Sequence, residues 1–199
     1  MANPRHINFT RGIPAAECFP TEKIGAAAQL ALRKHKTVIL QYGNSYGFLP
    51  LRELIADWHG LEVESVLCSN GSLQIIELLC SVLLQSENKT VFVEAPTYDR
   101  AITRLRRHGA KIVTIPLQED GPDIERLEYQ LHSHKPCFFY VIPDFQNPAG
   151  TTCSREKREQ LVELARRHRY IYVEDSPYRA LRYRGIQEPA LFDMAPDVV

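Results

Sequence analysis

The sequence predicts an α/β fold: a three-layer sandwich in which helices cover both faces of a mainly parallel sheet. Two observations predict it. Short apolar segments alternate with helix-like segments along most of the 199 residues, which is the pattern of parallel strands joined by crossover helices. The short segments are apolar at successive positions, as expected for strands that are buried on both faces. The composition, 44% hydrophobic and 24% charged, is that of an ordinary globular domain.

The N-terminal part of the chain contains two predicted helices. Residues 1–20 include several glycines and prolines and are expected to form an irregular arm. Thr21 can cap a helix that runs through an alanine-rich stretch to about residue 36. After a polar loop, Pro50 suits the first turn of a second helix. The apolar positions of that helix are Leu51, Leu54, Ile55 and Trp58.

Strands and helices alternate through the rest of the chain. Strands are predicted at 66–68, 90–93, 111–115, 137–142 and 170–173. Helices are predicted at 72–84, 97–108, 123–131 and 154–169. Gly109 ends the second of these helices, and Asp123 caps the third. The composition of residues 181–199 is compatible with a further strand and a proline-rich loop.

Charge and hydropathy exclude several classes of protein. The 24 basic and 24 acidic residues give a net charge of zero, so neither nucleic acid nor a membrane surface is an expected partner. No apolar run has the length of a transmembrane helix, and residues 1–20 lack the apolar core of a signal peptide, which predicts a cytoplasmic protein. The five cysteines are odd in number and widely spaced. They favour buried free thiols over disulfides or a zinc site.

Polar clusters follow several predicted strands, at the end of the sheet where parallel α/β folds bind ligands. In the first cluster, Gly71 permits close approach of a ligand, and the helix start with the Ser72 hydroxyl favours a phosphate. Helix capping by Asn70 or Ser72 is the simpler explanation of this cluster by itself. In the second cluster, Tyr98 can stack on a planar ligand. A tyrosine in the core is again the simpler explanation by itself.

The remaining clusters carry an amide and a carboxylate. Two prolines and a glycine constrain residues 143–150 and preset Asn147 as a hydrogen-bonding group, although Asn-Pro turns are common. Asp175 follows an apolar strand, where a protonated ring nitrogen would be a good partner; a solvated acidic strand end is the alternative. A phosphate site, a stacking ring, an amide and a carboxylate, with Tyr178, match the needs of pyridoxal 5'-phosphate (PLP).

These motifs resemble those of the aspartate-aminotransferase-like (fold type I) PLP-dependent enzymes, the class I/II aminotransferases. The resemblance covers nearly the whole chain in family order. The matching segments are Ile7-Asn8-Phe9, Gln41-Tyr42-Gly43, Asn70-Gly71-Ser72, Glu94-Ala95-Pro96-Thr97-Tyr98, Phe145-Gln146-Asn147-Pro148 and Glu174-Asp175 with Pro177-Tyr178. Within the family, the chain looks similar to 2-aminoadipate-type aminotransferases and to the aminotransferase-like halves of certain bacterial transcription regulators.

The resemblance implies a transfer of an amino group between an amino acid and a 2-oxo acid. It also implies a homodimer, in which Tyr42 would reach the cofactor phosphate of the partner subunit. Gly12 would line the substrate pocket. The residues that the resemblance assigns to the cofactor within one chain are Gly71, Ser72, Leu73, Tyr98, Asn147, Asp175 and Tyr178.

The sequence departs from the family in its lysines. In the family, the lysine that forms the Schiff base with PLP follows the aspartate strand by a few dozen residues, whereas the last lysine here is Lys157. All seven lysines are expected to be solvated surface charges, and no residue is assigned as catalytic. We expect an arm and first helix at 1–40 and a partial PLP-binding large domain at 41–199, truncated before the C-terminal small domain. Such a chain would bind PLP non-covalently at best and be inactive alone.

The alternative is a non-catalytic module that binds PLP or an amino acid, related to the aminotransferase-like transcription regulators. No helix-turn-helix pattern precedes the arm, which weighs against it. A remnant that binds nothing is a third interpretation. His132, His134 and Cys137 lie close in sequence without the spacing of metal ligands, so no metal is expected.

Overall fold

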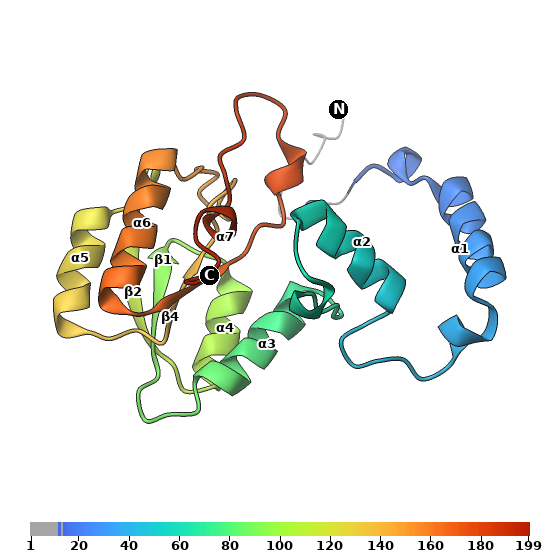
Figure 1. Cartoon of the computed structure of the whole chain (residues 1–199). Coiled ribbons are helices and arrows are strands. Elements are labelled where there is room, and N and C mark those ends of the chain that lie inside the picture. The colour runs from blue at the N-terminus through green and yellow to red at the C-terminus, as the bar shows by residue number, and fades with distance from the viewer. Residues whose placement is uncertain (1–11, 13) are drawn as a thin grey trace, which may run out of the picture. The chain divides into compact units, whose positions relative to one another are not determined.

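The computed structural model describes residues 12 and 14–199, which divide into two compact units (Figure 1). The first unit ends at Cys68, and the second runs from Ser69 to Val199. This division reflects internal packing, and the predicted domain boundary between residues 40 and 41 remains a prediction. The segment Ile7-Asn8-Phe9 and most of the predicted arm lie outside the described residues.

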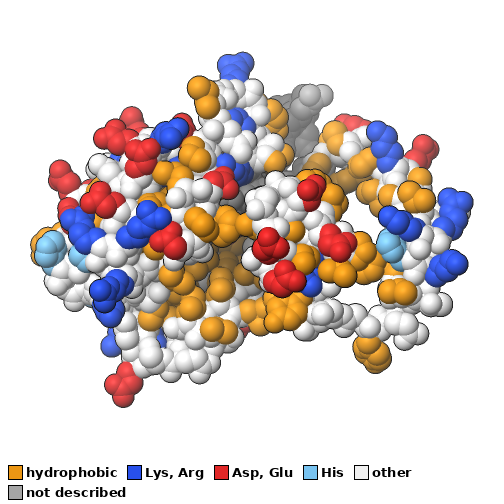
Figure 2. All heavy atoms as spheres, viewed as in Figure 1, with side chains coloured by type: hydrophobic (Ala, Val, Ile, Leu, Met, Phe, Trp, Pro, Cys, Tyr) orange, Lys and Arg blue, Asp and Glu red, His pale blue; other side chains and the backbone are white. Residues whose placement is uncertain are grey.

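The described part of the first unit is helical. Its two α-helices, α1 (Thr21–His35) and α2 (Leu49–His59), match the predicted helices, and Pro50 lies in the first turn of α2. The predicted cap at Thr21 is wrong, because Pro20 occupies the cap position and no side chain caps this helix start. Short 3-10 helices accompany them: η1 (Ala16–Cys18), η2 (Lys36–Leu40) and η3 (Val63–Ser65). None of the residues described in α1 is buried, and Figure 2 shows hydrophobic side chains at the surface over this helix.

The strand predicted at 66–68 is wrong. The backbone at Val66 is extended, but the segment joins no sheet in the described chain. Arg52, which is buried on α2, donates from Nε to the carbonyl of Val66 at 2.7 Å. The N–H of Cys68 donates to the carbonyl of Tyr46 at 2.8 Å. The polar backbone groups are therefore satisfied by a side chain and a loop, so apolar character alone did not make a strand.

The second unit contains a five-stranded sheet in the order β3-β2-β1-β4-β5. The two-residue strand β3 runs antiparallel to β2, and all other pairs are parallel. The strands are β1 (Thr90–Ala95), β2 (Lys111–Gln118), β3 (Gly121–Pro122), β4 (Phe138–Val141) and β5 (Ile171–Glu174). The predicted mainly parallel sheet is confirmed.

Helices cover both faces of this sheet, which confirms the predicted three layers (Figure 1). Residues of α3 and α4 contribute to the core on one face, and residues of α5, α6 and α7 contribute to the core on the other. The bounds are α3 (Ser72–Leu83), α4 (Asp99–Arg107), α5 (Ile124–Ser133), α6 (Arg155–His168) and α7 (Leu191–Met194).

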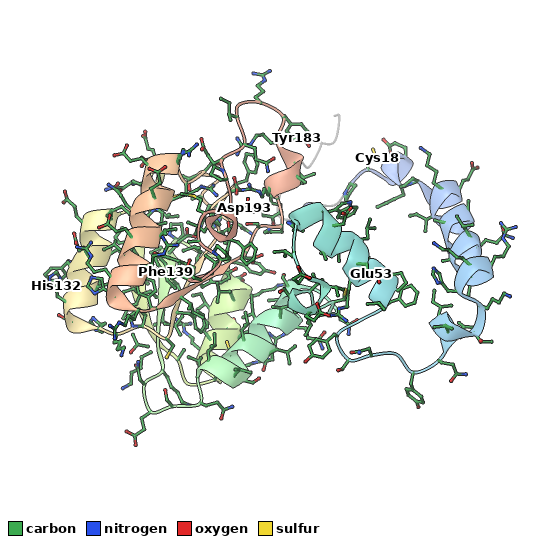
Figure 3. The ribbon with its side chains drawn as sticks, in the orientation of Figure 1. Cys18, Glu53, His132, Phe139, Tyr183 and Asp193 are labelled. Atoms are coloured by element: carbon green, nitrogen blue, oxygen red, sulfur yellow. The ribbon has the colours of Figure 1, made fainter. Side chains whose placement is uncertain are left out.

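Successive strand residues serve opposite cores. Phe92 and Phe139 belong to the core beneath α5 and α6, whereas Val93 and Tyr140 belong to the core beneath α3 and α4. Phe139, labelled in Figure 3, is fully buried. Because both faces of each strand are covered, the strands show no alternation of polar and apolar residues, as the sequence indicated.

The C-terminal stretch forms no strand in the described structure, so the further strand considered for residues 181–199 is absent. The stretch contains the end of the 3-10 helix η4 (Arg179–Leu181) and then α7. Val198 nevertheless lies beside β5, because its carbonyl accepts a hydrogen bond from the N–H of Tyr172 at 2.7 Å.

Lys157 is not the solvated surface charge that the sequence suggested. It is 9% exposed, and its ammonium lies 2.7 Å from Oδ1 of Asp120. The hydrogen bond from Lys157 lowers the pKa of the Asp120 carboxyl. The long apolar stem of a lysine can be buried while its charged end reaches a partner, and the position of that partner is a tertiary property.

The cysteines agree in part with the prediction. All five are free, with Cys80 and Cys153 buried and Cys18 exposed. Among the residues that the structure describes, no group of three or more His, Cys, Asp or Glu is arranged to hold a metal ion. In the same residues, no helix has both the length and the apolar character needed to cross a membrane.

Candidate functional site

A pocket in the second unit collects most of the predicted cofactor-binding residues. It lies at the carboxyl ends of β4 and β5 and at the start of α3. Its volume is about 110 Å³, below the roughly 300 Å³ typical of pockets that enclose a small molecule. A ligand would therefore be partly enclosed by this unit. The lining residues are Ser72, Tyr98, Ile142, Asn147, Asp175, Pro177 and Tyr178.

The start of α3 forms one wall of the pocket. Gly71 precedes the helix with a φ of 99°, a left-handed conformation that favours glycine. No side chain caps the helix start at this residue. The N–H groups of Ser72 and Leu73 belong to the first turn, where a helix has no internal acceptor for them. Together with the Ser72 hydroxyl they can bind an anion.

The side chain of Gln74 stabilises the loop that precedes α3. Its Oε1 accepts a hydrogen bond from the N–H of Asn70 at 2.8 Å. The side chain therefore holds the loop before the helix instead of facing a ligand. This contact gives Gln74 a structural role at the helix start.

Tyr98, Asn147 and Tyr178 supply a ring, an amide and a phenol to the pocket. Tyr98 lies at the N-cap of α4 and is partly buried against the core beneath that helix. Nδ2 of Asn147 lies 3.5 Å from the hydroxyl oxygen of Tyr178, at the outer limit of a hydrogen bond. Both groups consequently keep hydrogen-bonding capacity for a ligand.

Asp175 supplies the carboxylate of the pocket. Its N–H donates to the carbonyl of Val141 at 2.9 Å, which extends the pairing of β5 with β4 by one residue. One carboxylate oxygen, Oδ2, accepts a hydrogen bond from the hydroxyl of Tyr140 at 2.7 Å. A half-buried carboxylate with a single neutral donor is suited to a cationic partner.

A buried glutamate and glutamine tie the end of β1 to the loop that carries Asn147. Oε2 of Glu94 accepts from Nε2 of Gln146 at 3.0 Å and from the N–H of Ile142 at 3.1 Å. The same Nε2 donates to the carbonyl of Pro96 at 2.8 Å, and Oε1 accepts from the N–H of Ala149 at 2.8 Å. Burial raises the pKa of Glu94 to about 7, against the effect of both hydrogen bonds.

A second buried cluster holds the segment after Tyr178. The carboxylate of Asp144 is fully buried and lies 3.1 Å from Arg158, 2.9 Å from Arg179 and 3.3 Å from Arg182. Arg158 is itself fully buried and donates to the backbone carbonyls of Pro143, Cys153 and Pro189, each at 3.0 Å. The cluster joins the loop before Asn147 to the segment that begins at Arg179.

The other predicted residues lie outside the pocket lining. Gly71 and Leu73 flank Ser72 at the helix start. Tyr42 and Gly12 belong to the first unit, where both are exposed, and Tyr42 has no shielding at all.

Sequence reasoning missed the supporting residues Tyr140, Glu94 and Gln146. A hydroxyl or a carboxylate at a position surrounded by apolar residues is a signal, because a buried polar group needs a partner. For Glu94, the signal is an acid at the end of an apolar strand. The identity of the partner could not be deduced, since Glu94 and Gln146 are 52 positions apart in sequence.

Comparison with known proteins places the chain in a family. The family model for "Aminotransferase class I and II" matches residues 5–198. A 2-aminoadipate transaminase from Thermus thermophilus is 38% identical over 192 residues, which are 96% of this chain and 48% of the relative. An uncharacterized HTH-type transcriptional regulator from Bacillus subtilis is 28% identical, over 98% of this chain and 46% of the relative.

Solved structures give the same result. The α-aminoadipate aminotransferase LysN from Thermus thermophilus, complexed with N-(5'-phosphopyridoxyl)-L-leucine, has a TM-score of 0.89 and 39% identity, covering 95% of this chain and 48% of that one. A kynurenine aminotransferase from Pyrococcus horikoshii, solved with PMP, has a TM-score of 0.82 and 34% identity, covering 92% and 48%. The chain thus spans about half the length of these relatives. Its fold is that of the large domain of PLP-dependent transferases, and the chain belongs to the class I and II aminotransferase family.

Proposed function

We propose that this chain forms the PLP-binding part of a transaminase that moves an amino group between an amino acid and a 2-oxo acid. The observation that carries the proposal is the convergence of predicted cofactor residues from separate segments in one pocket. These residues are Ser72, Tyr98, Asn147, Asp175 and Tyr178. Two solved relatives, one complexed with a phosphopyridoxyl compound and one with PMP, support the choice of cofactor.

The chemical groups of the pocket fit PLP. The Ser72 hydroxyl and the free N–H groups at the start of α3 suit its phosphate. The ring of Tyr98 provides a surface for the pyridine ring. The carboxylate of Asp175 has an oxygen available to pair with a protonated pyridine nitrogen. Asn147 and Tyr178 can donate hydrogen bonds to the phenolic oxygen.

PLP, when bound, supplies an electron sink that stabilises negative charge on the carbon that carries the amino group. The task of Asp175 is to hold the proton on the pyridine nitrogen, which keeps the ring electron-poor. The hydrogen bonds from Asn147 and Tyr178 would stabilise the negative charge on the phenolic oxygen of PLP. Among the described residues, none of those lining the pocket is a lysine, so we propose that this chain binds PLP non-covalently.

We further propose a cytoplasmic homodimer. In it, Tyr42 would contact the cofactor phosphate of the partner subunit, and Gly12 would line the substrate pocket. The complete exposure of Tyr42 leaves its ring available for such a contact. Sedimentation of the chain tests the dimer. The affinity of the dimer for PLP, compared between the wild type and Tyr42→Phe, tests the contact. A chain that sediments as a monomer in the presence of PLP would contradict this proposal.

The cofactor assignment is tested by calorimetric titration of the chain with PLP. We expect saturable binding, and we expect Asp175→Asn to weaken it by roughly 10- to 100-fold, because a hydrogen bond to a charged group is lost. Asp57→Asn is the matched control, since Asp57 is exposed on α2. Absence of PLP binding, or equal binding by the two variants, would refute the assignment.

A binding module without catalysis is the second candidate function. The similarity to a transcription regulator over 98% of this chain favours it. Both candidates predict that PLP binds in the same pocket. They differ in whether an added amino acid is converted into its 2-oxo acid, which is measured by chromatography of the reaction mixture. Conversion supports the transaminase. PLP binding without conversion, both by the chain and by the chain joined to the remaining half of a family member, supports the binding module.

A further inference from the structure

Tyr140 lies on an inner strand of the sheet, and its hydroxyl contacts the carboxylate of Asp175 in the pocket. It belongs to β4, where it is in register with Val93 on β1 and with Val173 on β5. The side chain is 1% exposed. Its hydroxyl donates to Oδ2 of Asp175 at 2.7 Å. This is the sole polar side-chain contact of Tyr140 in the described structure.

The phenol is a permanent donor. Burial raises the pKa of Tyr140 far above its ordinary value of 10, and the charge of Asp175 and the hydrogen bond to it raise this pKa further. The hydroxyl therefore keeps its proton throughout the physiological range. A hydrogen bond from a neutral donor to a carboxylate is shorter and stronger than one between two neutral groups, so this contact strongly orients its acceptor.

The contact leaves a defined part of the carboxylate free. Oδ2 is engaged by Tyr140, and the backbone N–H of Asp175 is engaged by Val141. Among the described residues, no donor forms a hydrogen bond with the other carboxylate oxygen. That oxygen is consequently the acceptor left for a ligand in the pocket that Asp175 lines.

We propose that Tyr140 is a positioning residue of this pocket: it fixes the carboxylate of Asp175 so that the free oxygen accepts the hydrogen bond from the protonated ring nitrogen of PLP. Tyr140 does not line the pocket, so it acts through Asp175. The inference rests on the proposed function, because it presupposes that PLP occupies the pocket.

The test compares two ligands with the full 199-residue chain. One is PLP, and the other is an analogue in which a C–H group replaces the ring nitrogen. We expect Tyr140→Phe to raise the dissociation constant of PLP roughly tenfold, as expected for one hydrogen bond to a charged group, and to leave that of the analogue unchanged. Tyr129→Phe is the matched control, because Tyr129 is exposed on α5. A purely structural role of the hydroxyl would weaken both ligands equally.

A double-mutant cycle identifies the route of the effect. In the Asp175→Asn background, Tyr140→Phe should have no further effect on PLP binding, because the carboxylate through which it acts is gone. Equal loss for PLP and the analogue, or full additivity in the cycle, would overturn the inference while leaving the proposed function intact. A wild-type chain that does not bind PLP would overturn the proposed function itself, and the inference with it.

A second substitution covers the case in which Tyr140→Phe does not fold. Incorporation of 3-fluorotyrosine at position 140 keeps the hydroxyl and makes it a more acidic, stronger donor. The ratio of PLP affinity to analogue affinity should then rise above that of the wild-type chain. An unchanged or lower ratio would contradict the positioning role.

Discussion

Because Glu94 is buried, the free energy of unfolding of this chain should depend on pH. Glu94 is 2% exposed, and burial raises its pKa from 4.5 to about 7. The folded chain therefore holds a proton on this carboxyl between pH 4.5 and about 7, whereas the unfolded chain releases it. Because the folded state binds more protons in this window, its stability falls as the pH rises.

The size of the effect follows from the two pKa values. Their difference of about 2.5 corresponds to about 3 kcal/mol, since one pKa unit is worth about 1.4 kcal/mol. The contribution of Glu94 is fully present below pH 4.5 and is lost as the pH rises through about 7. Glu94→Gln keeps an oxygen for the N–H groups of Ile142 and Gln146 and cannot titrate, so its stability should lack this loss.

Urea denaturation of both proteins between pH 4.5 and 8.5 measures the effect. The free energy of unfolding of the wild type, relative to Glu94→Gln, should decrease by about 3 kcal/mol across this range. Glu53→Gln serves as the control, because Glu53 is exposed on α2 (Figure 3). A difference between wild type and Glu94→Gln that is constant with pH, or that grows as the pH rises, would refute the reasoning.

Three further substitutions test the packing of the second unit. Asp144→Asn should lower the free energy of unfolding by about 3–5 kcal/mol in urea, because Arg158 then stays buried without its counterion; a loss below about 1 kcal/mol would contradict this. Gly121→Ala should lower the free energy of unfolding by about 2 kcal/mol, and with it the thermal midpoint, since the φ of Gly121 is +124° and a Cβ would lie 2.8 Å from Sγ of Cys153; an unchanged midpoint would contradict this. Tyr172→Phe should cost about 1–2 kcal/mol by removing the hydroxyl that donates to a backbone carbonyl at 3.0 Å, and equal urea midpoints would argue against that bond.

Local sequence signals predicted the longer helices and strands of the second unit, although not the two-residue strand β3 or the short helix α7. Asp123 accepts from the N–H of Arg126 at 2.9 Å, as a helix cap should. Ser154 likewise caps α6 through the N–H of Lys157. These two caps depend on residues within a few positions of each other, so the sequence is sufficient to find them.

Predictions failed where a distant group changed the environment of a residue. The segment 66–68 has the composition of a strand, but the carbonyl of Val66 accepts a hydrogen bond from Arg52, and no strand of the described chain pairs with the segment. Lys157 carries a charge typical of surface residues, but its side chain is buried and its ammonium forms an ion pair with Asp120. In both cases local propensity was outweighed by a tertiary contact that no short window contains.

By itself, the sequence determined the α/β class, the positions of most helices and strands, and the order of the motifs that resemble a PLP site. These properties follow from periodicity, caps and short motifs. The tertiary structure alone decided which groups meet. Tyr140 reaches Asp175 because β4 pairs with β5 in a particular register, and Gln146 reaches Glu94 because β4 lies beside β1. Strand order and register arise from the packing of the whole unit, so the residues that support the pocket appear when the chain is folded.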